Sequence, residues 1–165
     1  MTPLQRKKFT NQIQRILHVP GNYRGGVLEF VIVVDYCLSQ EVINVAVKEM
    51  ITVLKNTDKI FLNARLNIIK WISDEKIIKE VSSMGMAQMG RSFEVWENGD
   101  SKKSYDELTR QLKLFYARSK IVIVLSKGDY ITKEKEEVEK NLKPFLGRKM
   151  YLISPNDILD MNHEK

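Results

Sequence analysis

An apolar run that ends in a carboxylate is the feature that most constrains the fold of this chain. Phe30 to Val34 are all strongly apolar, and Asp35 follows them directly. An unbroken run of this kind predicts a strand that is buried on both faces, as in a parallel sheet covered by helices. In open sheets of this class, ligands bind beyond the carboxyl ends of the strands. We therefore expect Asp35 to lie at the functional edge of the fold.

The size and composition of the chain fit one globular domain. Of its 165 residues, 43% are hydrophobic and 29% are charged, which is ordinary for a globular protein of this length. No apolar run approaches the roughly 20 residues that span a bilayer, and the amino-terminal residues do not resemble a signal peptide. We therefore expect a cytoplasmic protein. Cys37 is the only cysteine, which excludes an intramolecular disulfide and a zinc site built from several thiolates.

Positive charge is concentrated at the amino-terminal end of the chain. The formal net charge is +6, but residues 1–28 contain five basic residues and no acidic ones. These basic residues are Arg6, Lys7, Lys8, Arg15 and Arg24. The rest of the chain is nearly neutral, with 22 basic against 21 acidic residues. We interpret residues 1–26 as a basic amphipathic arm and residues 27–165 as the domain proper.

The arm also has an apolar stripe. Its members recur at helical spacing and are Phe9, Ile13, Ile16 and Leu17. Apolar residues at this spacing need a surface to cover, so docking on the domain is the preferred interpretation. The five cations offer two alternatives, which are contacts with nucleic-acid phosphates or with an anionic membrane surface.

Apolar periodicity predicts alternating strands and helices for most of the chain. The predicted order is a strand at 30–34, a helix at 40–56, a hairpin of strands at 64–72 and 75–81, a loop region at 82–100, a helix at 105–117, a strand at 121–125, a helix at 133–142, a strand at 149–153 and a helix at 156–161. Ser104 and Glu107 have capping-box spacing at the start of the 105–117 helix. The alternation predicts a three-layer, Rossmann-like α/β fold, with a mostly parallel sheet, helices on both faces and one antiparallel edge hairpin.

With these elements, residues 27–155 resemble a von Willebrand factor A-type (vWA) domain. In that family a D-x-S-x-S loop after the first strand, a threonine from a second loop and the aspartate of a T-D-G turn bind a divalent cation, commonly Mg²⁺. An acidic residue of a partner protein completes the coordination of this cation. Here Asp35 and Ser39 match the first and last members of the loop, and Cys37 replaces its middle serine. Ser101 is the nearest candidate for the threonine, and Ser126-Lys127-Gly128 stands where T-D-G is expected.

These departures imply a degenerate metal-ion-dependent adhesion site. A thiol is a poor ligand for a hard cation, and an ammonium replaces a carboxylate at Lys127. Asp35 and Ser39 are the only remaining metal candidates, and we expect no cofactor. We hypothesise that Lys127 lies near Asp35 and takes the place of the cation.

Less specific interpretations apply to the same residues. Ser39 precedes a helix and fits a simple N-cap, and Cys37 fits a packed, inert thiol. The turn from Ser126 to Asp129 also resembles the guanine-reading N/T-K-x-D turn of GTPases, but the first strand lacks the glycine-rich phosphate loop that such proteins need. No catalytic motif occurs, so we do not expect an enzyme.

The expected function is that of a non-catalytic, cation-independent protein-interaction module of vWA type. Its contacts with a partner would come from the carboxyl ends of the strands, at Asp35, Cys37, Ser39, Ser101, Ser126, Lys127 and Asp129. The partner is an unidentified protein; the resemblance implies a larger ATPase-type complex, since bacterial intracellular members of the family often serve such machines. The alternative is a nucleic-acid-associated accessory protein that uses the basic arm.

Overall fold

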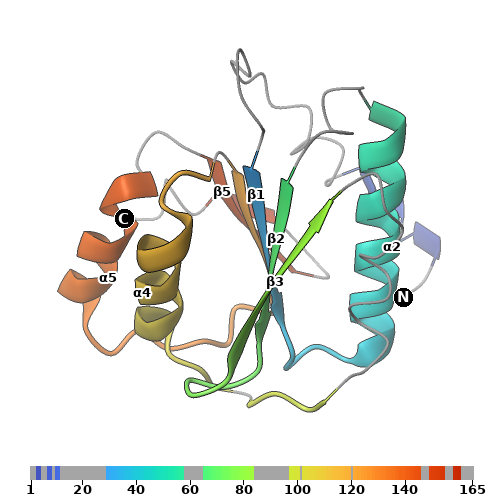
Figure 1. Ribbon diagram of the computed structural model, residues 1–165. Helices are drawn as coiled ribbons and strands as arrows, with labels where there is room; N and C mark the ends of the chain where they lie inside the picture. The colour runs from blue at the N-terminus through green and yellow to red at the C-terminus, as the bar shows by residue number, and fades with distance from the viewer. Residues whose placement is uncertain are drawn as a thin grey trace.

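The protein is represented by a computed structural model, which describes residues 3–4, 7–8, 10–11, 29–57, 65–83, 97–100, 102–119, 121–145, 149–154 and 158–160. Its strands are β1 (Glu29–Asp35), β2 (Arg65–Trp71), β3 (Ile77–Ser83), β4 (Ile121–Leu125), β5 (Lys149–Ile153) and β6 (Ile158–Asp160). Its named helices are α2 (Gln40–Thr57), α4 (Tyr105–Tyr116), α5 (Lys135–Leu142) and the short 3-10 helix η2 (Lys143–Phe145) (Figure 1).

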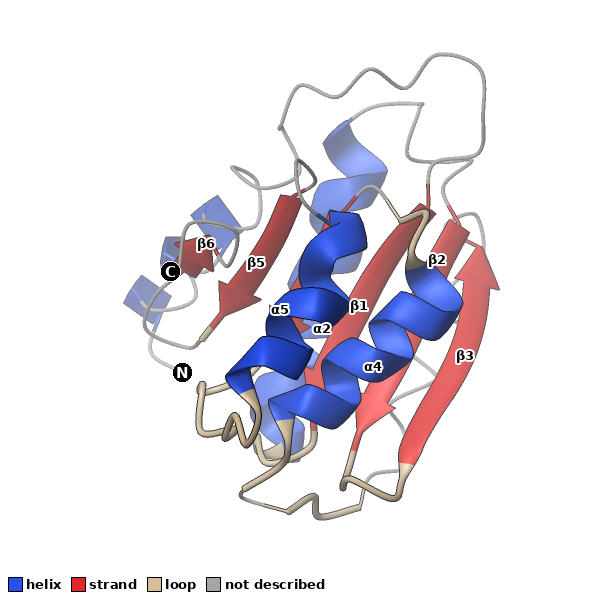
Figure 2. Ribbon diagram, turned by 90° about the vertical axis from the view of Figure 1, so that its left-hand side faces the viewer, coloured by secondary structure: helices blue, strands red, loops and turns tan. Residues whose placement is uncertain are grey.

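The strands form one six-stranded sheet in the order β3-β2-β1-β4-β5-β6. The four central strands are parallel, and β3 and β6 are antiparallel strands at the two edges. Helices α4 and α5 cover one face of the sheet and α2 covers the other (Figure 2). This confirms the predicted three-layer α/β fold. The strand order changes direction between β1 and β4, which makes their carboxyl ends the topological switch point of the sheet.

Strand β1 is buried on both faces, as its sequence predicts. Each residue from Phe30 to Val34 is at most 1% exposed. Val31 and Val33 belong to the core cluster that α4 and α5 cover together with Val122 and Val124 of β4. Because side chains alternate along a strand, the residues between them face the α2 layer. An apolar residue at every position is therefore what this central strand requires.

Local side-chain caps position the two longest helices. Ser104 Oγ accepts a hydrogen bond from the Glu107 amide at 3.3 Å, which confirms the N-cap of the capping box. Ser39 caps α2 in the same way, because its Oγ accepts from the Val42 amide at 3.2 Å. Both helices begin near the carboxyl ends of the strands, α2 because it follows β1 and α4 because Lys103, just before it, contacts Asp35.

The predicted helix at 156–161 is wrong. Ile158–Asp160 form β6, which pairs antiparallel with β5 through Ile153↔Ile158 and Tyr151↔Asp160. A helix of so few residues gains too few hydrogen bonds to offset its nucleation cost. The open edge of β5, in contrast, offers backbone groups that a short strand satisfies at once. The sheet consequently has a second antiparallel edge, which the sequence pattern does not predict.

The described part of the amino-terminal arm contacts helix α2. Thr10 Oγ1 donates a hydrogen bond to the Glu49 carboxylate on α2. Lys7 and Lys8 are exposed. The apolar stripe and the boundary at residue 26 lie outside the described residues, as does most of the region predicted as a loop at 82–100, although Ser82 and Ser83 end β3. Among the helices that are described, none has the length and apolar character needed to cross a membrane.

Candidate functional site

A buried carboxylate lies at the switch point of the sheet. Asp35 ends β1, and its side chain is 3% exposed. Its Oδ1 accepts from the Cys37 amide at 2.9 Å, and its Oδ2 accepts from Ser126 Oγ, at the end of β4, at 2.6 Å. The ammonium of Lys103 forms an ion pair with Oδ1. Both carboxylate oxygens are thus engaged by groups of the chain itself.

Lys103 is as deeply buried as its partner, with 1% of its side chain exposed. Its Nζ also donates to the Asp100 carbonyl oxygen at 2.9 Å and lies 5.0 Å from the centroid of the Trp71 ring. A carboxylate, a carbonyl and an aromatic face all stabilise an ammonium in a site that water does not reach. A buried charge is tolerated only when it is paired in this way.

Backbone hydrogen bonds hold the segment that carries Lys103. The Gly99 amide donates to the Tyr36 carbonyl at 3.1 Å and the Asp100 amide to the Ile72 carbonyl at 2.8 Å, so this segment lies over the ends of β1 and β2. On the other side, the Ile131 amide donates to the Lys103 carbonyl at 2.8 Å. The ammonium is therefore positioned by the backbone on both sides of its residue.

Gly99 permits the close approach of this segment to β1. A Cβ atom at this position would lie 2.9 Å from both the carbonyl carbon and the Cβ of Tyr36. Contacts this short do not occur between real atoms of these types without a shift of the backbone. The segment from Gly99 to Lys103 can therefore reach Asp35 only because residue 99 has no side chain.

Ser126 connects the two halves of the sheet at this point. It is fully buried, donates to Asp35 and accepts from the Gly128 amide at 3.0 Å. Gly128 has φ +84°, a left-handed conformation that favours glycine, and it turns the chain away from the sheet. The residues that follow Ser126 are consequently directed to the surface.

These groups do not fit a divalent metal ion. Mg²⁺ requires several oxygen ligands, but Oδ1 of Asp35 faces an ammonium, and Cys37 contributes only its backbone amide. Ser39 is exposed, and its hydroxyl caps α2. The described residues contain no group of three or more histidine, cysteine, aspartate or glutamate side chains that could hold a metal. The positive charge opposite Asp35 comes from Lys103.

The hypothesis that Lys127 neutralises Asp35 is wrong. Lys127 is exposed, and the buried ammonium on Asp35 belongs to Lys103. The end of the strand explains the difference: β4 ends at Leu125, and Lys127 lies beyond it, directly before the turn at Gly128, where the chain has reached the surface. Lys103 carried no recognisable signal, because it lies in a polar stretch between Ser101 and Ser104 that has no apolar period.

The structure brings together some of the predicted site residues and separates others. Asp35 and Ser126 are buried and in contact, and Cys37 is half-buried. Ser39, Lys127 and Asp129 are exposed beside them. Ser101, Arg6, Arg15 and Arg24 lie outside the described residues.

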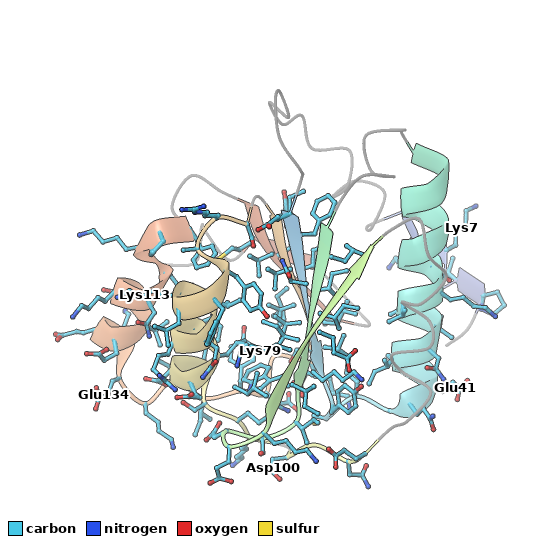
Figure 3. The ribbon with its side chains drawn as sticks, viewed as in Figure 1. Lys7, Glu41, Lys79, Asp100, Lys113 and Glu134 are labelled. Carbon is cyan, nitrogen blue, oxygen red and sulfur yellow. The ribbon has the colours of Figure 1, made fainter. Side chains whose placement is uncertain are left out.

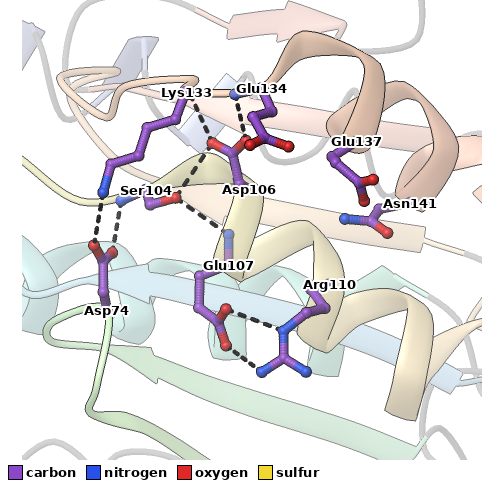
Figure 4. A pocket seen from close by; sticks show the side chains of 9 residues that line it. All are labelled: Asp74, Ser104, Asp106, Glu107, Arg110, Lys133, Glu134, Glu137 and Asn141. Carbon is purple, nitrogen blue, oxygen red and sulfur yellow. Dashed lines mark hydrogen bonds and ion pairs between the residues drawn. The ribbon is translucent and has the colours of Figure 1, made fainter.

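A second polar network surrounds the N-terminus of α4 (Figure 4). The Asp74 carboxylate accepts from the Ser104 amide at 2.7 Å and lies 4.0 Å from Lys133 Nζ. The Asp106 carboxylate accepts from the Lys133 amide at 2.8 Å and the Glu134 amide at 2.7 Å, so it caps the start of α5. These residues line a pocket of about 410 Å³.

The capping bonds determine the ionisation of Asp106. Desolvation raises its pKa, but the hydrogen bonds from the Lys133 and Glu134 amides and from Ser104 favour the carboxylate and outweigh it. The pKa of Asp106 is therefore below its usual value. The neighbouring Glu107 also has a lowered pKa, because the Arg110 guanidinium donates to it.

The side chains of Asp35, Tyr36, Lys103 and Ser126, which we call the strand-end cluster, are all buried. Ser126 Oγ donates a hydrogen bond to the Asp35 carboxylate and is buried. The ammonium of Lys103 forms an ion pair with the same carboxylate and is equally buried. Tyr36 is buried beside them, and desolvation, followed by the nearby Glu80 and Glu97 carboxylates, raises its pKa to about 12. These three side chains are therefore inaccessible to solvent.

Comparisons of the chain with protein-family models, with curated proteins and with solved structures find no match.

Proposed function

We propose that this chain is a non-catalytic protein-interaction module of vWA type that contacts its partner through the carboxyl ends of the strands, without a bound cation. The observation that carries the proposal is the buried ion pair between Lys103 and Asp35. In the family that the sequence resembles, a metal ion beside the equivalent carboxylate is completed by an acidic residue of the partner. Here the charge of Asp35 is balanced within the chain, so recognition needs no metal.

The order of elements supports the proposal. The vWA resemblance requires a strand that ends at Asp35, a long helix, a strand with a hairpin partner, a capped helix and a strand that ends at Ser126. Strand β1, helix α2, the β2–β3 hairpin, helix α4 and strand β4 occur in that order. In addition, Asp35 and Ser126 contact each other across the switch point, where ligands bind in sheets of this class.

The proposed contact surface consists of the exposed residues that surround the sealed pair. Ser39, Asp100, Lys127 and Asp129 are exposed at this edge of the sheet. They present both signs of charge, which favours a polar, mixed-charge surface on the partner. A partner within a larger ATPase-type complex is part of the same proposal and follows from the family resemblance. A cytoplasmic location is proposed with it, because no apolar run of the sequence is long enough to span a bilayer.

The first experiment measures the dependence on cations. The melting temperature of the native chain is measured in EDTA and in millimolar Mg²⁺, Mn²⁺ or Ca²⁺. A ligand that binds only the folded state raises its stability, by about 2.7 kcal/mol at 100 times the dissociation constant. We expect no response. Stabilisation of the native chain by any of these ions would contradict the proposal.

The second experiment tests the surface itself. A photo-crosslinking residue is placed at Lys127, and in a matched control at Lys140, which is exposed on α5. We expect a discrete crosslinked protein only from position 127, formed equally in EDTA and lost when Asp129→Lys is added. Equal crosslinking from position 140, or loss of the product in EDTA, would contradict the proposal.

Exposure of Lys7 and Lys8 keeps nucleic-acid binding by the arm as a second candidate. If the arm binds phosphates, affinity for a DNA or RNA duplex should fall steeply with salt. Reversing both charges, with Lys7→Glu and Lys8→Glu, should then reduce both the affinity and its salt dependence. Unchanged binding in that double variant would exclude this candidate.

A further inference from the structure

Two large apolar side chains are exposed at consecutive positions of α4. Leu114 is 59% exposed and Phe115 is 60% exposed. The other large hydrophobic residues found exposed in the described part of the chain, Leu4 and Ile131, are distant from them in sequence. Single exposed apolar residues are normal, whereas large side chains exposed at neighbouring positions begin to form the kind of apolar patch that other molecules cover.

Cations surround this pair. Arg110, Leu114 and Arg118 are spaced four residues apart, so they follow one face of the helix and of the turn that ends it. Lys79 of β3 places its Nζ 4.5 Å from the centroid of the Phe115 ring. Figure 3 shows Lys79 on the sheet side of α4 and Lys113 on the side toward α5. We call this surface the α4 patch, and its members are Lys79, Arg110, Lys113, Leu114, Phe115 and Arg118.

Two of these four cations, Lys113 and Arg118, lack an anionic partner within the described residues. Arg110 is paired with Glu107 at 2.6 Å. Within the described residues, neither Lys113 nor Arg118 has a carboxylate within ion-pair distance. The acidic residues of α4 are confined to its first turn. The carboxyl-terminal half of α4 therefore presents uncompensated positive charge around two apolar side chains.

Helix electrostatics explain only part of this arrangement. Cations near the C-terminus of a helix interact favourably with the helix dipole, which accounts for Lys113 and Arg118. The dipole gives no reason for Leu114 and Phe115 to be exposed. Phenylalanine and arginine are, however, enriched in protein interfaces, in which apolar anchors are surrounded by polar rims.

We propose that the α4 patch docks an acidic, amphipathic segment of a partner protein. Apolar side chains of that segment pack on Leu114 and Phe115, and its carboxylates face Lys113, Arg118 and Lys79. The apolar residues of the patch, Leu114 and Phe115, lie on the carboxyl-terminal half of α4, whereas the strand-end cluster adjoins the N-terminus of that helix. This proposal is therefore independent of the proposed partner contact at the carboxyl ends of the strands, and each can be tested without the other.

The probe is a fluorescein-labelled helical peptide with leucine on one face and glutamate on the other. Fluorescence anisotropy measures the binding of this peptide to the full chain. Two control peptides are measured in the same way, one with alanine for leucine and one with lysine for glutamate. Binding of the full chain to vesicles of phosphatidylserine and phosphatidylcholine is measured separately. We expect binding only of the leucine–glutamate peptide. Equal binding of the alanine or lysine peptide, no peptide binding, or binding of the vesicles alone would overturn the proposal.

Matched variants locate the binding surface. We expect Leu114→Ser, Phe115→Ser and the charge reversal Lys113→Glu with Arg118→Glu each to weaken binding by about tenfold or more, as hot-spot residues do. The apolar control is Ile131→Ser, at a residue that is 41% exposed elsewhere. The charge control is Lys135→Glu with Lys140→Glu on the exposed side of α5. Equal weakening by the controls, or no weakening by the patch variants, would overturn the proposal.

Discussion

Two polar networks adjoin the N-terminus of α4, and they place similar groups in opposite surroundings. Lys103 and Asp35 are sealed from water, with 1% and 3% of their side chains exposed. Ser104, the next residue, belongs to a network with Asp74 and Asp106 that opens into a pocket. In the first network, loss of one charge leaves the other buried without a counter-charge. In the second network, water can hydrogen-bond to the groups that remain after one is lost. Burial therefore decides how much each polar contact contributes to the free energy of unfolding.

The largest effect is expected for Lys103→Met. The substitution leaves the Asp35 carboxylate buried without its counter-charge, which should reduce the free energy of unfolding by about 3–5 kcal/mol. Urea unfolding measures the change. The control is Lys102→Met, because Lys102 is exposed and adjacent. Similar stabilities of the two variants would show that losing the buried charge costs no more than losing an exposed one.

The double variant Asp35→Asn with Lys103→Met tests whether the two charges act as a pair. Removing both should cost less than the sum of the single substitutions, with a coupling of about 1–3 kcal/mol, because no uncompensated ion remains. A double-mutant cycle in urea measures this coupling. Strictly additive costs would mean that Lys103 contributes by packing on Trp71 rather than by its charge.

Gly99→Ala tests how the buried pair is positioned. The new Cβ would lie 2.9 Å from the carbonyl carbon of Tyr36, and relieving this contact should cost about 1–3 kcal/mol. The added methyl should also loosen the bond between the Gly99 amide and the Tyr36 carbonyl, which amide hydrogen exchange detects. Unchanged stability would indicate that the segment moves without disturbing Lys103.

In the open network, Asp106→Ala should cost about 1 kcal/mol, as the loss of a helix cap typically does. The pKa of Asp106 is lowered in the folded state, so its stabilisation is fully present above the usual value of 3.8 and is lost as the pH falls through the lower, folded-state pKa. The stability difference between the native chain and the variant should therefore vanish in strong acid. A difference that persists at all pH values would show that the carboxylate charge is not its source.

The smallest effect is expected for Arg110→Gln. Its ion pair with Glu107 lies on an exposed helix surface, where water screens the attraction. The urea midpoint should not change measurably. A clear loss of stability would mean that the open network resembles the sealed one and would remove the contrast between them.

Much of the fold could be predicted because its signals are local. The apolar runs of β1 and β4 and the capping box at Ser104 each specify an element from neighbouring residues alone. Strand β6 could not be predicted, since its three residues adopt a strand only because the edge of β5 is open beside them. The positions of two residues of the candidate site could also be predicted, because Asp35 and Ser126 each follow an apolar strand run directly.

The sequence alone determined that a carboxylate and a serine would end two central strands, because strand burial and chain order follow from apolar periodicity. Only the tertiary structure decided which cation neutralises Asp35. Lys103 and Lys127 are both lysines in polar segments, and their different roles depend on backbone contacts made by Gly99 and Ile131 with distant parts of the chain. Charge pairing across 68 positions of sequence is set by the packing of the layers, and that information is not local.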